Sequence, residues 1–184
     1  TLCVLIGPPP ALATPIERPA GATLSTLQPP PPSRLVGAQP IANYSATYAV
    51  GMDTFDFAED IKDPSDPTGT TYIGEFGMVI PENKGMLHHD LSKTIAFDVW
   101  LFDKTDERQI QTATRTLLSV YAHDKMYDEF QRQKPNLTPL VAQPGLNFQL
   151  EAQQLVLDCT VRSVTYTSDG IFKNLAVDLV VKRK

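Results

Sequence analysis

The residues that most resemble a reactive or metal-binding site are three in a row, His88, His89 and Asp90. Neighbouring side chains of an extended chain point to opposite faces, so two adjacent histidines do not readily chelate one ion. The other histidine, His123, and the only domain thiol, Cys159, are distant in the sequence. We therefore expect His88 and His89 to be loop histidines in water rather than metal ligands.

An acidic segment between residues 53 and 66 is a second candidate, because carboxylate oxygens are the ligands that Ca²⁺ prefers. Its spacing is not that of an EF-hand loop, since no D-x-D-x-D-G core precedes a distal glutamate. A solvated acidic loop, facing a basic patch of a partner, is the preferred interpretation. The weak candidate ligands are Asp53, Asp56, Asp60 and Asp63.

Signatures of common catalytic sites are missing from the sequence. It contains no G-x-S-x-G elbow, no cysteine beside a local histidine and no glycine-rich phosphate loop. We expect a protein that is not an enzyme and that carries no cofactor. Tyr44, Tyr48 and Trp100 could form an aromatic ligand patch, but core packing is preferred because large aromatic side chains mostly fill cores and interfaces.

The prolines divide the chain into an arm and a domain. Of the 16 prolines, those at positions 8, 9, 10, 15, 19, 29, 30, 31, 32 and 40 lie in the first 40 residues. Each fixes φ and removes a backbone N–H, so we expect an extended, polyproline-like arm. The predicted units are an apolar anchor-like end at 1–7, the arm at 8–43 and a β-rich globular domain at 44–184.

The apolar run at 1–7, TLCVLIG, has two interpretations. It is too short to span a bilayer, which takes about 20 residues. It could be the end of a transmembrane or signal segment that lies mostly upstream, or an apolar tip that docks on a protein partner.

The net charge of −5 limits the choice of partner. Because the domain is acidic and has no basic cluster, we expect no nucleic-acid partner.

Apolar alternation predicts most of the strands of the domain. The predicted strands are 44–50, 55–57, 72–80, 93–102, 146–152, 155–161 and 175–181, and 93–102 should lie centrally in its sheet. Glycines at 74 and 77 indicate a bulge or a close backbone approach. Ser168-Asp169-Gly170 predicts the turn of a long final hairpin.

Two helices are predicted in the middle of the domain. The apolar residues between Ile110 and Tyr121 have helical spacing, although the threonines at 112, 114 and 116 leave a strand open. A second helix is predicted at 125–133, with Asp124 as its cap. The expected fold is mainly β, an antiparallel sandwich or partly open barrel of six to seven strands with one or two covering helices.

The chain resembles a group of uncharacterised bacterial proteins in two segments. These are residues 72–80 and the predicted strand that contains F-D-V-W-L-F-D-K, a motif ending at Lys104. Those proteins place a transmembrane helix and a proline-rich linker before a domain with a similar strand. The resemblance implies a membrane-anchored bacterial protein, and it implies no catalytic residue.

These observations favour a non-enzymatic structural or accessory subunit of a larger, membrane-associated assembly, which contacts other protein subunits through residues 1–43. The alternative is a stalked cell-surface module that binds Ca²⁺, a glycan or a peptide. The expected partner-binding residues of the arm are Leu24, Leu27, Pro29, Pro30, Pro31, Pro32, Leu35 and Ile41.

Overall fold

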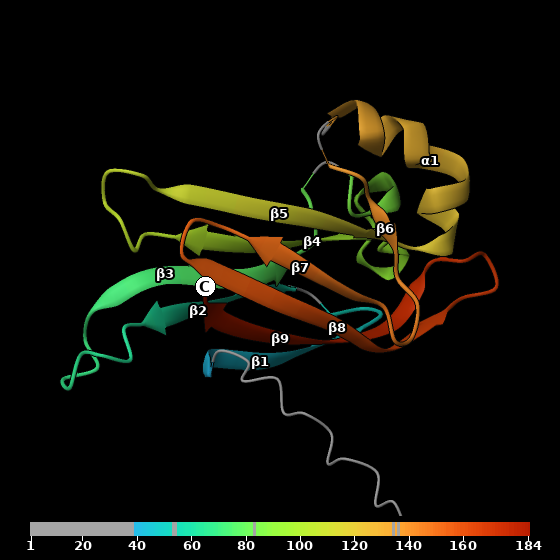
Figure 1. The fold of residues 1–184 in the computed structure, drawn as a ribbon. Helices are drawn as coiled ribbons and strands as arrows, with labels where there is room; N and C mark the ends of the chain where they lie inside the picture. Colours follow the sequence, from blue (N-terminus) through green and yellow to red (C-terminus); the bar gives the residue numbers. More distant parts are fainter. Residues whose placement is uncertain (1–38, 53–54, 83, 134, 136) are drawn as a thin grey trace, which may run out of the picture. The chain divides into compact units, whose positions relative to one another are not determined.

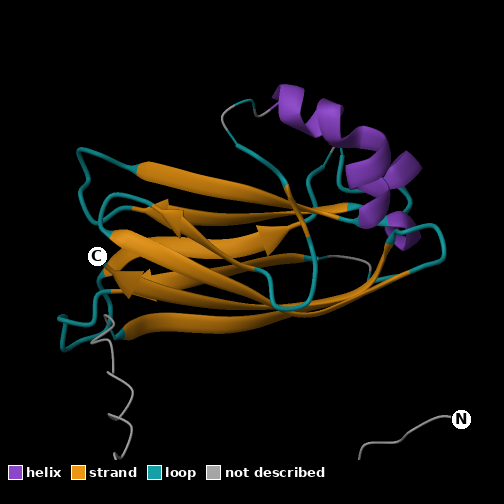
Figure 2. Cartoon of the chain, turned by 45° about the vertical axis from the view of Figure 1, so that its right-hand side comes forward, coloured by secondary structure: helices purple, strands orange, loops and turns teal. Residues whose placement is uncertain are grey.

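A computed structural model describes residues 39–52, 55–82, 84–133, 135 and 137–184. These residues form two facing β-sheets with one α-helix at one end (Figures 1 and 2). The mainly β, sandwich-like fold expected from the sequence is therefore confirmed, and the sheets do not close into a barrel. The predicted anchor-like end at 1–7 and most of the predicted arm lie outside the described residues.

The four-stranded sheet, here sheet A, is antiparallel throughout and has the order β1-β9-β8-β7. Its long pair β8–β9 turns at 168–170, where Gly170 has a φ of +80°, which confirms the predicted hairpin. The bounds of the strands are β1 (Pro40–Ala49), β7 (Asn147–Glu151), β8 (Leu155–Tyr166) and β9 (Phe172–Arg183).

The five-stranded sheet, here sheet B, has the order β2-β3-β4-β5-β6. Its pairs are antiparallel except the short parallel pair β5–β6. The central position predicted for the strand that contains Trp100 is confirmed, because β4 is the third of the five. The bounds are β2 (Asp56–Lys62), β3 (Tyr72–Val79), β4 (Ala96–Asp103), β5 (Gln111–Leu118) and β6 (Leu140–Val141).

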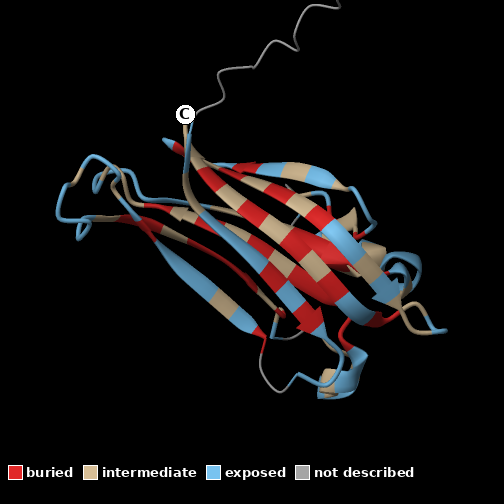
Figure 3. Ribbon diagram, turned by 90° about the horizontal axis from the view of Figure 1, so that it is seen from below, coloured by how far each residue is buried: buried red, intermediate tan, exposed pale blue. Residues whose placement is uncertain are grey.

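The main hydrophobic core fills the space between the two sheets. Buried and exposed residues alternate along the strands, as Figure 3 shows, because successive side chains of a strand point to opposite faces. Near the centre, the ring of Phe97 makes edge contacts with Tyr48, Phe55 and Phe172, with centroids 5.0–5.2 Å apart. Pairs with this geometry add specific attraction to area burial.

The helix α1 (Val120–Gln133) covers one end of the sandwich. Ala122 and Phe130 of α1 pack with Ala96 and Leu118 of sheet B in a second, smaller apolar cluster. Two short 3₁₀ turns, η1 (Leu87–His89) and η2 (Leu91–Lys93), precede β4 at this end. No helix in the described part of the chain is long and apolar enough to cross a membrane.

The helix predicted between Ile110 and Tyr121 is wrong. Residues 111–118 form β5, paired with β4 along their whole length. The β-branched threonines at 112, 114 and 116, which left the strand interpretation open, occupy one face of this strand, where branched side chains pack well. The two added strands, β5 and β6, account for the difference between the predicted six to seven strands and the nine described.

The predicted second helix is correct in type but begins earlier, at Val120. Its cap is Ser119, whose hydroxyl accepts a hydrogen bond from the Ala122 N–H at 3.1 Å, whereas the predicted cap Asp124 lies inside the helix.

The first strand also begins earlier than predicted, at Pro40 instead of residue 44. A proline is tolerated there because it is the first residue of an edge strand.

Candidate functional site

The outer face of sheet A is polar, and its charged groups pair with one another. Asp178 accepts a hydrogen bond from Ser45 at 2.6 Å and forms an ion pair with Arg162 at 2.9 Å. Asp158 forms an ion pair with Lys182 at 2.7 Å. Cross-strand pairs of this kind are typical of a solvated sheet face.

The outer face of sheet B is different, because large apolar side chains lie on it. Residues that face each other across antiparallel strands share one side of the sheet. The register aligns four uncharged residues in a central row across β2, β3, β4 and β5: Ala58, Gly77, Trp100 and Thr114. Trp100, the only tryptophan of the chain, is half-buried in this row.

Gly77 allows the indole ring of Trp100 to lie against the sheet. A Cβ atom at position 77 would stand 2.7 Å from Cζ2 and 2.9 Å from Cε2 of Trp100. The ring therefore lies across the backbone of β3, with one side covered by Gly77. This is the close backbone approach that the glycines at 74 and 77 indicate.

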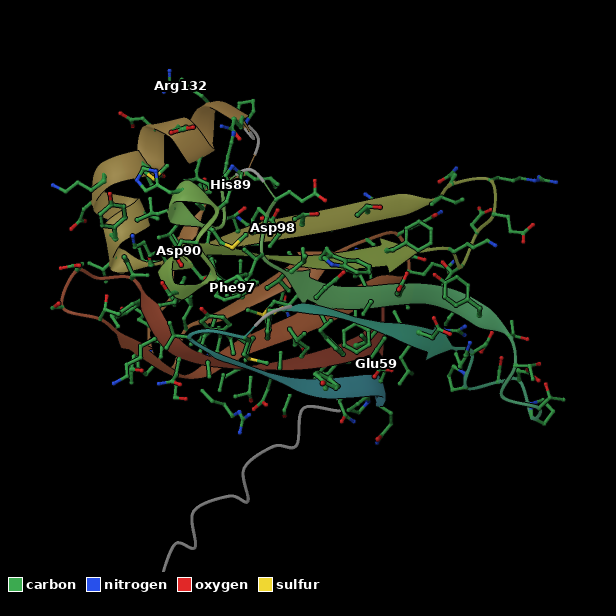
Figure 4. The ribbon with its side chains drawn as sticks, turned by 180° about the vertical axis from the view of Figure 1, so that it is seen from behind. Glu59, His89, Asp90, Phe97, Asp98 and Arg132 are labelled. Carbon is green, nitrogen blue, oxygen red and sulfur yellow. The ribbon has the colours of Figure 1, made fainter. Side chains whose placement is uncertain are left out.

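An acidic row lies on each side of the central row. One row consists of Asp56, Val79, Asp98 and Thr116, and the other consists of Asp60, Glu75, Phe102 and Thr112. The hydroxyl of Thr116 donates to Asp98 at 2.5 Å. The core residue Phe97 and its outward-facing neighbour Asp98 can be followed in Figure 4. We call these three rows together the Trp100 face.

Tyr72 extends the aromatic surface beyond the second acidic row. The ammonium groups of Lys62 and Lys104 lie 5.4 Å and 6.0 Å from the centroid of its ring. Lys62 also pairs with Asp60 at 2.7 Å. Burial raises the pKa of the Tyr72 hydroxyl, and the nearby charges of Glu75 and Asp60 raise it further, so the neutral phenol is favoured.

The weak candidate metal ligands do not converge. Asp53 lies outside the described residues, while Asp56 and Asp60 belong to the two different acidic rows of the Trp100 face. Asp63 accepts hydrogen bonds from Ser65 and pairs with Arg183 at 3.0 Å. Within the described ranges, no three His, Cys, Asp or Glu side chains gather closely enough to hold a metal ion.

The acidic loop after β2 is ordered by its own hydrogen bonds. The carboxylate of Asp66 accepts bonds from the backbone N–H and hydroxyl groups of Thr68, Thr70 and Thr71. The bonds from Thr68, and next those from Thr71, hold the pKa of Asp66 well below its ordinary value.

The histidine pair is exposed in η1, at the end of the molecule where α1 and its Arg132 lie (Figure 4). His88 and His89 have φ values of +54° and +56°, which are uncommon for residues other than glycine. The next residue, Asp90, accepts bonds from the N–H and hydroxyl of Ser92. His123 is on α1 and contacts Asp124 at 3.0 Å.

Among the predicted partner-binding residues, those from Leu24 to Leu35 lie outside the described residues. Ile41 is in β1 and packs, partly buried, against the main core. The aromatic patch considered from the sequence is not formed, because Tyr48 is fully buried and Tyr44 stacks on Phe57 with centroids 3.6 Å apart.

The Trp100 face therefore comes from residues that sequence reasoning did not combine. The alternation of residues 94–102 places Trp100 opposite the core side of its strand. That signal could have identified an outward-facing tryptophan, but not its neighbours on the other strands.

Comparisons of the chain with protein-family models, with curated proteins and with solved structures gave no match.

Proposed function

We propose that this protein is a non-enzymatic structural or accessory subunit of a larger assembly in a bacterial membrane, and that its proline-rich arm contacts neighbouring protein subunits. The observation that carries the proposal is the attachment of the arm. The last residues of the arm, 40–43, already belong to β1, an edge strand that pairs with β9 from Pro40 opposite Lys182 to Ala49 opposite Asn174.

This attachment supports an assembly role because it gives the arm a firm base. β1 is fastened to both sheets, through its ladder to β9 and through the stacking of Tyr44 on Phe57 of β2. Its inward side chains, Ala46 and Tyr48, are buried in the main core. A force applied to the chain at residue 39 would therefore be transmitted through β1 to both sheets. A proline-rich segment also loses less entropy on binding than other segments do, because each proline restricts φ before binding.

Membrane association is the part of the proposal that rests on the resemblance and on the apolar run at 1–7. It is tested by expressing the chain with its natural flanking sequence and measuring the share that sediments with membranes after a carbonate wash.

Deletion of residues 8–35 tests the role of the arm. We expect the protein that lacks these residues to keep its thermal unfolding transition, because the core lies within the described domain. We also expect it to be missing from the complex that native electrophoresis and sedimentation detect for the full chain. A complex of unchanged size and composition after the deletion would contradict the proposal.

The Trp100 face favours a second candidate, a stalked module that binds a peptide or a glycan. An aromatic ring lying on a sheet beside carboxylates suits ligands with both apolar and polar sides. A module of this kind would keep its ligand after deletion of residues 8–35 and lose it when Trp100 is replaced, so the two candidates are distinguishable.

A further inference from the structure

We propose that the Trp100 face is the docking site for the segment Pro29–Pro30–Pro31–Pro32, with the following Arg34, of a second copy of this chain. The inference rests on the proposed function, since it names the surface that the arm of a neighbouring subunit contacts.

The first argument is the chemistry of the surface. Extended proline-rich segments bind to surfaces lined by aromatic side chains, on which their rings pack. On the Trp100 face the indole lies against Gly77, and Phe102 is two residues further along the same side of β4. Because the polyproline helix has three residues per turn, four consecutive prolines present a ring on each of its edges.

The second argument is size. The central row, from Ala58 to Thr114, crosses the three spacings between β2, β3, β4 and β5. At about 4.8 Å each, these spacings make a stripe of about 14 Å. Four residues in polyproline geometry span about 12 Å. The stripe therefore matches the length of the four-proline run.

The third argument is charge. Among the described residues, the acidic rows carry the carboxylates of Asp56, Asp60 and Glu75, and Asp56 and Asp60 lie on either side of Ala58 at the β2 end of the stripe. The ammonium group of Lys62 pairs with Asp60. The four prolines carry no charge, and Arg34 follows them by two residues, about 6 Å in extended geometry. A neutral stripe between acidic rows thus complements a neutral run that ends in a cation.

A contact of this kind joins two different surfaces of one chain. Such heterologous contacts propagate from copy to copy into a ring or a filament. The proposal therefore predicts assemblies that grow with protein concentration, without a second protein.

The single tryptophan provides the test, because its emission reports directly on the proposed site. The protein used is the chain from Val36, which keeps all of β1 and the core. The probe is a peptide of residues 28–36, QPPPPSRLV. We expect a saturable blue shift of the Trp100 emission. A peptide with alanine at all four proline positions should bind about tenfold more weakly, as should one with glutamate in place of Arg34.

Phe102→Ser and Tyr44→Ser form a matched pair of variants that both retain Trp100. Phe102 is on the Trp100 face, whereas Tyr44 belongs to sheet A, is 39% exposed and stacks on Phe57, so its variant controls for the loss of an aromatic contact away from that face. We expect Phe102→Ser to weaken peptide binding about tenfold and Tyr44→Ser to change it less than about twofold. Circular dichroism confirms that each variant is folded, and the more conservative Phe102→Leu replaces any variant that is not.

Sedimentation of the full chain completes the test. Its mass should rise with concentration, and an excess of the peptide or the Phe102→Ser substitution should reduce it. The inference is overturned if the peptide leaves the emission unchanged, if a soluble oligosaccharide shifts it at lower concentration than the peptide, or if the full chain stays monomeric at all concentrations. Loss of a native complex on deletion of residues 8–35, together with no peptide binding, would leave the proposed function standing and refute this docking site.

Discussion

The side chain of Asp103, at the end of β4 in sheet B, accepts a hydrogen bond at 3.1 Å from the backbone N–H of Leu155, the first residue of β8 in sheet A. The same oxygen accepts a second bond from the N–H of Gln154 at 2.7 Å, and the other oxygen accepts two from Thr105. Asp103 is only 1% exposed. One buried carboxylate thus ties the two sheets together at the end opposite α1.

Replacing Asp103 with alanine should destabilise the domain strongly. The buried backbone N–H of Leu155 would lose this acceptor at a cost of about 1–3 kcal/mol, and the N–H of the exposed Gln154 would lose its bond as well. We expect a loss of about 3 kcal/mol, measured by urea unfolding. The control is Asp106→Ala, which removes a carboxylate that caps the N–H of Arg108 in the next turn. If Asp103→Ala lowered the free energy of unfolding as little as the control does, the hydrogen bond from Leu155 to Asp103 would not be what joins the sheets.

The stability of the domain should fall below about pH 4 in a way that depends on Asp103. Burial alone would raise the pKa of this carboxyl, but the hydrogen bonds from Thr105, Gln154 and Leu155 outweigh it and lower the pKa. A group whose pKa is lower in the folded state stabilises the fold above its unfolded pKa, about 3.9, and loses this contribution as the pH falls through the folded value. The stability difference between wild type and Asp103→Asn should therefore be largest above pH 4 and shrink below it. A difference that stays constant from pH 6 to pH 2 contradicts this assignment.

Gly77→Ala should cost stability and disturb Trp100 at the same time. The new Cβ atom would lie close to the carbonyl oxygen of Phe57 and to the indole ring. We expect a loss of about 2 kcal/mol and a shifted tryptophan emission. At Gly145, where φ is +82° and no atom lies within 4 Å of a new Cβ, alanine should cost about 1 kcal/mol through backbone strain alone and leave the emission unchanged. Equal emission spectra for the two variants would refute the described position of the indole.

The thiol of Cys159 should resist alkylation while the domain is folded. It is buried in the main core, and burial, with a smaller effect of Asp158, raises its pKa far above the ordinary value. Because the thiolate is the reactive form, iodoacetamide should label it at least about a hundredfold more slowly in the native protein than in urea. The measurement uses a Cys3→Ser background, so that only one thiol reacts. Rapid labelling of the native protein would mean that β8 opens readily.

Local pattern was enough to predict the fold class, the central place of the strand with Trp100, and the final hairpin. It failed at residues 110–121, because the apolar positions there fit a helical period while the threonines fit a strand. Pairing with β4, the strand directly before it in the sequence, decided in favour of the strand, and the periodicity of residues 110–121 alone does not report on that partner.

The sequence by itself determined that the domain is a mainly β structure attached to a proline-rich arm, since alternation and proline act on neighbouring residues. The tertiary structure alone decided the Trp100 face and the bond from Asp103 to Leu155. A row across four strands depends on register, and a shift of one residue would turn every side chain to the opposite face. The buried carboxylate depends on contact between residues 52 positions apart in the sequence, which only the packing of the two sheets provides.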